Sequence, residues 1–312
     1  MSKRKVLIFG ATGEIGSRIA NLAVRAGHEV IGVTRGRAKA DYVDLSGIEF
    51  RTGDKYDESF LATLSDIKPD AVIDSIGCDR MIPIIQKYFP DAENVLFCSS
   101  TGSYVPLQYF PADENHPWQQ NTGLNFFHQC EWDMKALAEC EAGRFPITIL
   151  RPTNIIGETR VPLELWGGRN IDFYKTLKEG RTLFIPRVRD VMVQSGYNWD
   201  LASAFVKALE KGDAVRGEIF NISCRKAITL GEFLNTAVSY LNSSSEIVEL
   251  SDEDLQKAYP GKISMHYGLD FLKLHMCFDM RKAETVLGYD PQVTAQEGLI
   301  RSLRWLEENG KL

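Results

Sequence analysis

The segment at residues 5–16, KVLIFGATGEIG, constrains the fold of this chain more than any other stretch. Its apolar residues at 6–9 have the length of a buried strand, and three glycines follow at positions 10, 13 and 16. From residue 15 to residue 26, apolar side chains recur at steps of three and four, which predicts an amphipathic helix. A strand that leads through a glycine turn into a helix is typical of a phosphate-binding site.

The three glycines have separate physical roles in such a site. Gly10 allows a tight turn, Gly13 lets a pyrophosphate approach the backbone, and Gly16 lets the helix pack close to the strand. The helix then presents free N–H groups and the positive end of its dipole to the anion. An ordinary strand–helix turn without a ligand can carry the same letters, but the position directly after an apolar strand favours a dinucleotide. The predicted dinucleotide contacts of this loop are Gly10, Thr12, Gly13, Glu14, Ile15 and Gly16.

Strand and helix patterns alternate over the first half of the chain. Strand patterns cover residues 28–34, 48–52, 70–74, 94–98 and 146–150, and helical patterns cover 57–65, 80–89 and 124–142. This alternation predicts an α/β fold with a doubly wound, parallel, Rossmann-type sheet. Because ligands of such sheets bind at the carboxyl ends of the strands, we expect Asp54, Gly77 and Ser99 to contact the cofactor.

The pattern changes after Gly157, which predicts two domains. Residues 1–157 form the predicted dinucleotide-binding domain, to which elements from about 188–223 return. Residues 158–312 form a smaller, mostly C-terminal substrate-binding domain, with helices expected at 229–241, 281–287 and 294–308 and an irregular region at 243–276. A cleft between two such domains is where a small ligand usually binds.

The segment after the second predicted strand indicates which dinucleotide is preferred. No acidic residue occurs between positions 30 and 40, whereas Arg35 and Arg37 do. An acidic residue there binds the ribose 2′-hydroxyl of NAD, and an arginine suits the 2′-phosphate of NADP. A solvated basic loop would contain the same residues. We therefore predict NADP as the preferred cofactor, with NAD as the alternative.

Charge and cysteine content exclude several kinds of partner. The formal net charge is −6, which argues against nucleic acid because its phosphates usually demand a basic face. The six cysteines contain no C-x-x-C pair and no cluster with zinc spacing, so no metal is predicted and a reducing, cytoplasmic location is expected. No apolar stretch reaches membrane-spanning length, so no membrane partner is expected.

Several ordered motifs together resemble the extended short-chain dehydrogenase/reductases of the NAD-dependent epimerase/dehydratase family. These motifs are GATGEIG at 10–16, GD at 53–54, SSTGSY at 99–104, LRPTNIIG at 150–157, YNWDLA at 197–202 and GEIFNI at 217–222. The TRG at 34–36 and the GD at 53–54 are most similar to an atypical branch that includes chloroplast stem-loop-binding proteins. The resemblance covers nearly the whole chain and implies hydride transfer with a bound nicotinamide.

The resemblance also implies catalytic positions, one of which departs from the family pattern. Ser100 corresponds to the hydroxyl that holds the substrate oxygen, and Lys135 to the lysine that binds the nicotinamide ribose. The family's catalytic tyrosine position is Glu131 here. A carboxylate beside a lysine is a poor acid and a weak base, and the two residues can equally form an ordinary helical ion pair. The resemblance further places Pro152 and Asn154 at the cofactor, and Thr101, Asn154 and Arg187 at the substrate.

Other groups can be weighed as replacements for the missing phenol. Tyr104, Tyr109, His128 and Cys130 lie near the expected site, although a structural role explains Tyr104 and His128 more simply. Arg151, Asn154 and either Arg187 or Arg189 are candidates to contact an anionic part of the substrate, because arginine forks suit phosphate and carboxylate. The alternative is that these arginines are ordinary surface residues with no contact to a substrate.

Two functions of different classes follow. The first is an NAD(P)-dependent epimerase, dehydratase or reductase that acts on a sugar, nucleotide sugar or similar hydroxyl compound. The second is a catalytically atypical, NADP-binding regulator or RNA-associated protein with the same fold. The resemblance also implies a homodimer formed through the helices at 80–89 and 124–142.

Overall fold

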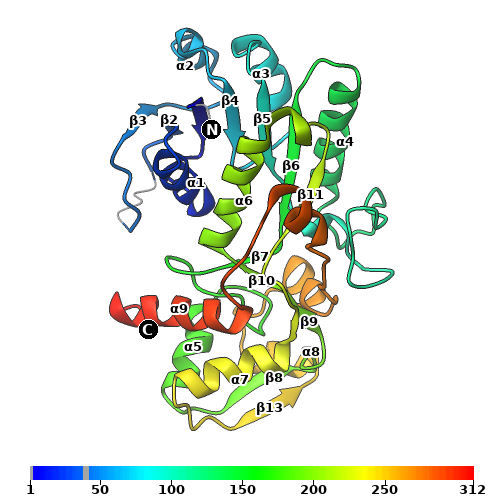
Figure 1. Cartoon of the computed structure of the whole chain (residues 1–312). Helices are drawn as coiled ribbons and strands as arrows, with labels where there is room; N and C mark the ends of the chain where they lie inside the picture. Colours follow the sequence, from blue (N-terminus) through cyan, green and yellow to red (C-terminus); the bar gives the residue numbers. More distant parts are fainter. Residues whose placement is uncertain (1–2, 38–41) are drawn as a thin grey trace.

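Seven parallel strands form the central sheet of this chain, whose computed structural model describes residues 3–37 and 42–312 (Figure 1). The strands are β1 (Lys5–Phe9), β2 (Glu29–Thr34), β3 (Ile48–Thr52), β4 (Ala71–Asp74), β5 (Asn94–Cys98), β6 (Ile147–Pro152) and β11 (Ile219–Ile222). Their order is β11-β6-β5-β4-β1-β2-β3, and all neighbouring pairs are parallel. The strand order reverses between β1 and β4, so a ligand crevice is expected at their carboxyl ends.

Helices cover both faces of this sheet because alternate residues of its strands point to opposite sides. Val6 and Ile8 of β1 belong to one apolar cluster, with α1 (Glu14–Arg25) and α6 (Asn198–Lys211). Leu7 and Phe9 belong to the opposite cluster, with α2 (Glu58–Ala62), α3 (Met81–Tyr88) and α4 (Phe127–Glu141). The predicted doubly wound α/β fold is confirmed.

A third apolar cluster lies beyond the carboxyl ends of the strands, in the lower part of Figure 1. Its helices are α5 (Ile171–Lys178), α7 (Leu230–Tyr240), α8 (Asp252–Ala258) and α9 (Ala295–Glu308), and its sheet pairs β8 (Leu183–Pro186) with β13 (Ile247–Leu250). Two more short pairs are β7 (Asn154–Ile156) with β10 (Ser195–Tyr197), and β9 (Met192–Val193) with β12 (Ile228–Thr229). The domain boundary at residue 157 stays a prediction.

The region at 243–276 is more ordered than its sequence predicts. It contains β13, α8 and a π-helix, η4 (Met265–Asp270). The helix α8 buries only Leu255 and begins at a Ser251 cap that accepts the Asp254 N–H, so it lacks the apolar periodicity of a longer helix. Short helical turns complete the fold at η1 (Ser65–Ile67), η2 (Thr101–Ser103), η3 (Gly212–Val215) and η5 (Ala283–Leu287).

Candidate cofactor and substrate cavities

A cavity of about 450 Å³ opens at the carboxyl ends of β1, β2 and β4. Nine of the predicted cofactor residues line it: Gly10, Thr12, Gly13, Glu14, Ile15, Gly16, Arg35, Arg37 and Asp54. The lining residues that the sequence did not single out include Thr34, Lys55, Tyr56, Ser75, Ile155 and Arg160. We call this the dinucleotide cavity.

The glycine loop is packed so closely that a side chain at Gly10 or Gly16 would collide with neighbouring atoms. Gly10 has a φ of +79°, in the left-handed region that favours glycine, and a Cβ there would lie 2.4 Å from the Ser75 hydroxyl oxygen. A Cβ on Gly16 would lie 2.1 Å from the Gly10 carbonyl oxygen, so the helix α1 can approach β1 only because residue 16 is glycine. The cap residue of α1, Gly13, has no side chain to fill the space before the first turn. The loop thus leaves the N-terminus of α1 open to an anion.

Two exposed arginines stand at the β2 end of this cavity. Arg35 and Arg37 both line it, as the prediction of a 2′-phosphate contact requires. Thr34 ties this end to the glycine loop, since its hydroxyl lies 2.8 Å from that of Thr12 and accepts the Gly36 N–H at 3.1 Å. The turn that presents the arginines is therefore connected to the glycine loop.

A buried ion pair beneath the cavity was not apparent from the sequence. The Lys55 ammonium donates to both carboxylate oxygens of Asp74, at 2.9 and 2.8 Å, and the Asp74 side chain is fully buried. Burial raises the pKa of Asp74, while the charge of Lys55 acts in the opposite direction. Asp74 is the last residue of an apolar strand, and only the position of Lys55 after the GD motif hinted at a role for that lysine.

One arginine from beyond the sheet reaches the glycine loop. Arg160 donates to the carboxylate of Glu14 at 2.7 Å, and Glu14 is the first residue of α1. The other carboxylate oxygen of Glu14 is buried and has no hydrogen-bond partner among the described residues. Arg160 also lines a second cavity, so the two spaces meet at this side chain and at Ile155.

This second cavity, of about 410 Å³, lies between the sheet and the third apolar cluster. Three of the predicted substrate residues line it: Ser100, Thr101 and Asn154. The Ser100 hydroxyl accepts the Gly102 N–H at 3.0 Å and caps η2. The apolar lining of the cavity comes mainly from Phe126, Leu163, Tyr267, Phe271, Leu272 and Met276. We call this the substrate cavity.

A second arginine, Arg169, gives the substrate cavity a positive wall. It donates to Asn154 Oδ1 at 2.7 Å, to the Ile155 carbonyl at 3.0 Å and to the Val161 carbonyl at 2.9 Å. Burial, with a smaller effect of the neighbouring Arg160 charge, lowers the pKa of Arg169 to about 10. It therefore keeps its charge at neutral pH. Arg160 and Arg169 belong to an irregular segment without a recognisable motif, so no pattern in the sequence points to them.

The predicted catalytic pair on α4 lies outside both cavities. Glu131 is exposed, and Lys135 is exposed and paired with Asp79 at 2.5 Å. Neither side chain is among the described residues that line the two cavities. The arrangement therefore does not bring them to Ser100.

The orientation of α4 is fixed by a buried network on its inner face. Asp133 Oδ2 accepts from Arg151 Nη2 at 2.7 Å, from Arg151 Nε at 3.0 Å and from the Ser99 hydroxyl at 2.8 Å. The guanidinium of Arg151 lies over the rings of Tyr104 and Trp118, 4.8 and 4.0 Å from their centroids. This corrects the assignment of Arg151 to an anionic substrate and of Ser99 to the cofactor, since both are used inside the protein.

Other predicted positions are also displaced from the cavities. Gly77 packs against β5, where a Cβ would lie 2.9 Å from Phe97 Cβ, and Pro152 is buried within β6. Arg187 is exposed and lines neither cavity, which corrects its assignment to the substrate; Arg169 stands there instead. Arg189 pairs loosely with Glu249 at 3.9 Å, away from both spaces.

None of the four groups considered as replacements for the phenol lines the substrate cavity among the described residues. Tyr104 is buried, and this burial raises its pKa to about 12. Tyr109 donates to Asp113 at 2.8 Å, and Cys130 donates to the Trp118 carbonyl. His128 is exposed and packs on Trp132. In the same described part of the chain, no three His, Cys, Asp or Glu side chains are grouped to hold a metal.

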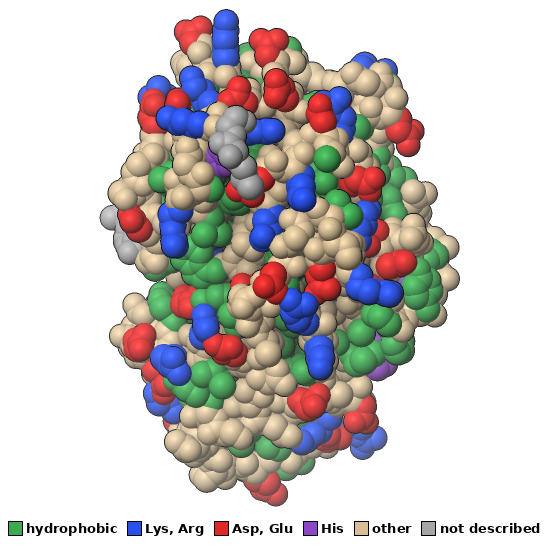
Figure 2. All heavy atoms as spheres, viewed as in Figure 1, with side chains coloured by type: hydrophobic (Ala, Val, Ile, Leu, Met, Phe, Trp, Pro, Cys, Tyr) green, Lys and Arg blue, Asp and Glu red, His purple; other side chains and the backbone are tan. Residues whose placement is uncertain are grey.

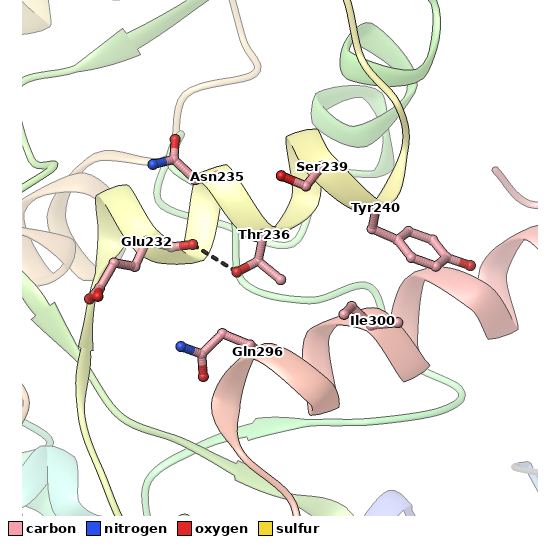
Figure 3. Close-up of a pocket in the computed structure, with 7 residues that line it drawn as sticks. All are labelled: Glu232, Asn235, Thr236, Ser239, Tyr240, Gln296 and Ile300. Atoms are coloured by element: carbon pink, nitrogen blue, oxygen red, sulfur yellow. Dashed lines mark hydrogen bonds between the residues drawn. The ribbon is translucent and has the colours of Figure 1, made fainter.

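A further hollow lies between α7 and α9 (Figure 3), and none of its described lining residues lines either of the other two cavities. Mostly uncharged side chains line it, among them Asn235, Thr236 and Gln296. Its one charged residue, Glu232, closes the capping box of α7 with Thr229. No helix in the described ranges has the length and apolar character needed to cross a membrane.

Comparison with known proteins gives concordant results. The model of the NAD-dependent epimerase/dehydratase family matches residues 6–80 and 74–223. The chain is 29% identical to the chloroplast stem-loop binding protein of 41 kDa b from Arabidopsis thaliana, over 96% of this chain and 79% of that protein. It is 24% identical to a putative UDP-glucose 4-epimerase from Methanocaldococcus jannaschii, over 98% of this chain and 99% of that protein.

Solved structures share the fold over nearly the full length. UDP-glucose 4-epimerase from Thermotoga maritima, solved with UDP-glucose, superposes with a TM-score of 0.73 at 18% identity, over 98% of this chain and 99% of that chain. The Bordetella bronchiseptica enzyme WbmG, in complex with NAD, superposes with a TM-score of 0.72 at 18% identity, over 99% of this chain and 96% of that chain. At these identities the likeness establishes the fold.

Proposed function

This chain belongs to the NAD-dependent epimerase/dehydratase family, and from that premise we propose that it is an enzyme that oxidises or reduces a hydroxyl-bearing carbon of a sugar, nucleotide sugar or similar compound. The observation that carries the proposal is the meeting of the two cavities at Ile155 and Arg160. A dinucleotide that extends from the glycine loop past Ile155 would bring its far end next to Ser100. Epimerisation, dehydration and reduction all begin from such a contact.

The residues present fit a pyridine dinucleotide. A cradle in which a Cβ at Gly16 would collide with the Gly10 carbonyl, followed by an open helix N-terminus, suits a pyrophosphate. When bound, the nicotinamide would accept and return a hydride. The complex of WbmG with NAD supports this assignment for the shared fold.

We infer NADP as the preferred form because Arg35 and Arg37 both line the β2 end of the dinucleotide cavity. Two guanidinium groups suit a 2′-phosphate, whereas a 2′-hydroxyl would leave them without an anion. The family description names NAD, so NAD stays the alternative.

The substrate cavity suits a polar, anionic hydroxyl compound. Ser100 would hold the reacting oxygen, Thr101 and Asn154 would contact neighbouring hydroxyls, and Arg160 with Arg169 would face the anionic part. The UDP-glucose bound to the Thermotoga maritima epimerase supports this substrate class. The homodimer and the cytoplasmic location stay predictions.

The proposal is tested by binding first and turnover second. We expect NADP to bind more tightly than NAD in calorimetry, and Arg35→Ala and Arg37→Ala each to weaken NADP by roughly 10-fold while sparing NAD. A panel of UDP- and dTDP-sugars is then added to the loaded protein, and the nicotinamide absorbance is followed. Equal binding of both dinucleotides in all variants would overturn the NADP preference, and failure of every sugar to change the absorbance would overturn the enzymatic function.

The second function, a regulatory or RNA-associated protein, has one supporting observation. The relative from Arabidopsis thaliana is named for stem-loop binding and aligns over 96% of this chain. The net charge of −6, and the interspersed acidic and basic side chains on the face in Figure 2, count against an RNA surface. Gel-shift titration with an RNA stem-loop decides it: we expect no binding at physiological salt, and tight, salt-sensitive binding would favour this alternative.

A further inference from the structure

The substrate cavity contains Ser100 but none of the side chains that were expected to move a proton. Among the described residues that line it, none is Asp, Glu, His, Cys or Lys. Its charged groups are the two arginines, which stay protonated and cannot exchange a proton near neutral pH. Tyr267 is the one phenol in this lining. A phenol is the group that the sequence lacks at position 131.

The ring of Tyr267 packs on a residue that also contacts the turn of Ser100. It stacks on Phe126, with ring centroids 5.9 Å apart and planes 18° apart. Phe126 in turn lies against Gly102, where a Cβ would be 2.1 Å from Phe126 Cδ2 and 3.2 Å from the Ser100 hydroxyl oxygen. Phe126 therefore contacts both the ring of Tyr267 and the turn that holds Ser100, and all three line the substrate cavity.

The backbone that presents Tyr267 is held close to the arginine segment. Tyr267 belongs to the π-helix η4. The π-helix is rare in proteins as a whole, and many of its examples lie at functional sites. The next residue, Gly268, packs on Gly167, where a Cβ would meet the Gly167 carbonyl oxygen at 2.8 Å. Both glycines line the substrate cavity. The π-helix and the segment that supplies Arg160 and Arg169 thus form one wall.

We propose that Tyr267 is the catalytic acid and base of this site, in place of the residue at position 131; this rests on the proposed function. In the reducing direction, the substrate carbonyl carbon receives a hydride from the reduced nicotinamide, and the carbonyl oxygen receives the proton of Tyr267 Oη. The C=O double bond becomes a C–O–H group, and a phenolate is left. In the oxidising direction the phenolate would take the hydroxyl proton, the carbon would give its hydrogen with the C–H electron pair to the oxidised nicotinamide, and the C–O–H group would become C=O.

The charges around Tyr267 are compatible with both steps. Arg160 and Arg169 line the same cavity, and their positive charges favour an anionic oxygen there. On the outer side, His266 packs edge-on against Tyr267, with ring centroids 4.5 Å apart. Tyr267 is 55% exposed, so it can exchange protons with solvent: it regains a proton after the reducing step and releases one after the oxidising step.

The test compares Tyr267→Phe with Tyr109→Phe, since Phe keeps the stacking on Phe126 and removes only the hydroxyl. Tyr109 is a matched control because it is also exposed and lies outside both cavities. We expect Tyr267→Phe to lower turnover of the active sugar by at least about 100-fold with dinucleotide affinity unchanged. Tyr109→Phe should leave both unchanged. Turnover by Tyr267→Phe equal to that of the wild type would overturn the proposal.

A second readout does not depend on a substrate. The ultraviolet absorbance of phenolate is titrated with pH in wild type and Tyr267→Phe, and the difference isolates the ionisation of Tyr267. Adding oxidised NADP should shift this transition to lower pH, because the positive nicotinamide would lie beside the phenol. An unchanged transition in protein that binds NADP would overturn the role of Tyr267. If no sugar is turned over but the transition shifts, the proposed function fails while the placement of Tyr267 stands.

Discussion

At the scale of single residues, we expect the carboxylate of Glu14 to affect the affinity of the dinucleotide cavity for an anion, because it lies in the lining of that cavity. It lies in the first turn of α1, beside the expected pyrophosphate, and is neutralised by Arg160 at 2.7 Å. A carboxylate there interacts favourably with the helix dipole but repels a phosphate. Arg160 therefore has two effects on the site: it offsets Glu14 and adds a cation where the two cavities meet.

This arrangement predicts opposite effects for the two partners. Arg160→Met should weaken NADP binding by roughly 10-fold or more, because it leaves an uncompensated carboxylate near the phosphates. Glu14→Gln should tighten binding, and the double variant should bind better than Arg160→Met alone. Calorimetry of NADP binding to the wild type, the two single variants and the double variant measures the coupling between Glu14 and Arg160.

The matched control is Arg144→Met, which breaks a pair with Glu139 on the outer end of α4. It should leave the affinity for NADP unchanged. The interpretation of Glu14 and Arg160 would be contradicted if Arg160→Met bound NADP as tightly as the wild type.

At the scale of secondary-structure elements, the buried pair of Asp133 and Arg151 fixes the rotation of α4 against the sheet. Their side chains are 4% and 0% exposed, and three hydrogen bonds converge on Asp133 Oδ2. Burial raises the pKa of Asp133, while the charge of Arg151 opposes this shift. Turning Asp133 inward leaves Glu131 and Lys135 of the same helix exposed.

We expect Asp133→Ala to lower the free energy of unfolding by roughly 3–5 kcal/mol, because it leaves Arg151 as a buried, unpaired charge. Glu131→Gln on the same helix is the control, and an exposed substitution of this kind should stay within about 0.5 kcal/mol. Urea unfolding followed by circular dichroism measures both. Equal stability of the two variants would contradict the structural role of Asp133.

The segment 158–170 contains a second buried carboxylate, that of Glu164. Its oxygens accept the N–H groups of Trp166, Gly168 and Asn170, at 2.5, 2.9 and 3.3 Å, and so shape the wall that carries Arg169. Burial raises the pKa of Glu164 to about 7, and the three N–H donors act against this shift. The wall is therefore sensitive to pH.

The sign of this sensitivity follows from proton binding. With a pKa of about 7 in the folded state and 4.5 as the ordinary value, only the folded state holds the proton between these values. The corresponding stability is present below pH 4.5 and is lost as the pH rises to about 7, by on the order of 3 kcal/mol. Between pH 4.5 and 7, the free energy of unfolding measured with urea should decline less in Glu164→Gln than in wild type. Glu93 is exposed, so the stability of the control Glu93→Gln should decline with pH as that of the wild type does. If Glu164→Gln declined as steeply as these two proteins, the raised pKa of Glu164 would be contradicted.

At the scale of the whole molecule, the two cavities lie at the carboxyl ends of the sheet strands, whereas the hollow between α7 and α9 (Figure 3) shares none of their described lining residues. A ligand slows hydrogen exchange where opening requires its release. With saturating NADP, we expect amides at 10–16, 34–37 and 53–56 to gain protection, and α7 and α9 to stay unchanged. Mass spectrometry measures this, and protection confined to α7 and α9 would contradict the position of the cofactor site.

The fold was predictable because its signals are local. The apolar strand at 6–9, the glycine spacing at 10–16 and the alternation of strands and helices each depend on neighbouring residues, and the observed sheet follows from them. The residues of the glycine loop, with Arg35, Arg37 and Asp54, line one cavity, and their contact with a cofactor stays a prediction. The segment at 243–276 was predicted less well, since its short helix and its π-helix lack a regular period.

The sequence by itself determined the sheet, the glycine loop before α1 and the basic turn after β2, because backbone preferences and periodicity act over a few residues. Only the tertiary structure decided which side chains share the substrate cavity. Arg160, Arg169 and Tyr267 come from segments far from Ser100 along the chain, and packing alone brings them into the lining of the same cavity. It also decided that α4 turns Asp133 inward and Glu131 outward, since a residue's place in a helix does not fix the rotation of that helix against a sheet.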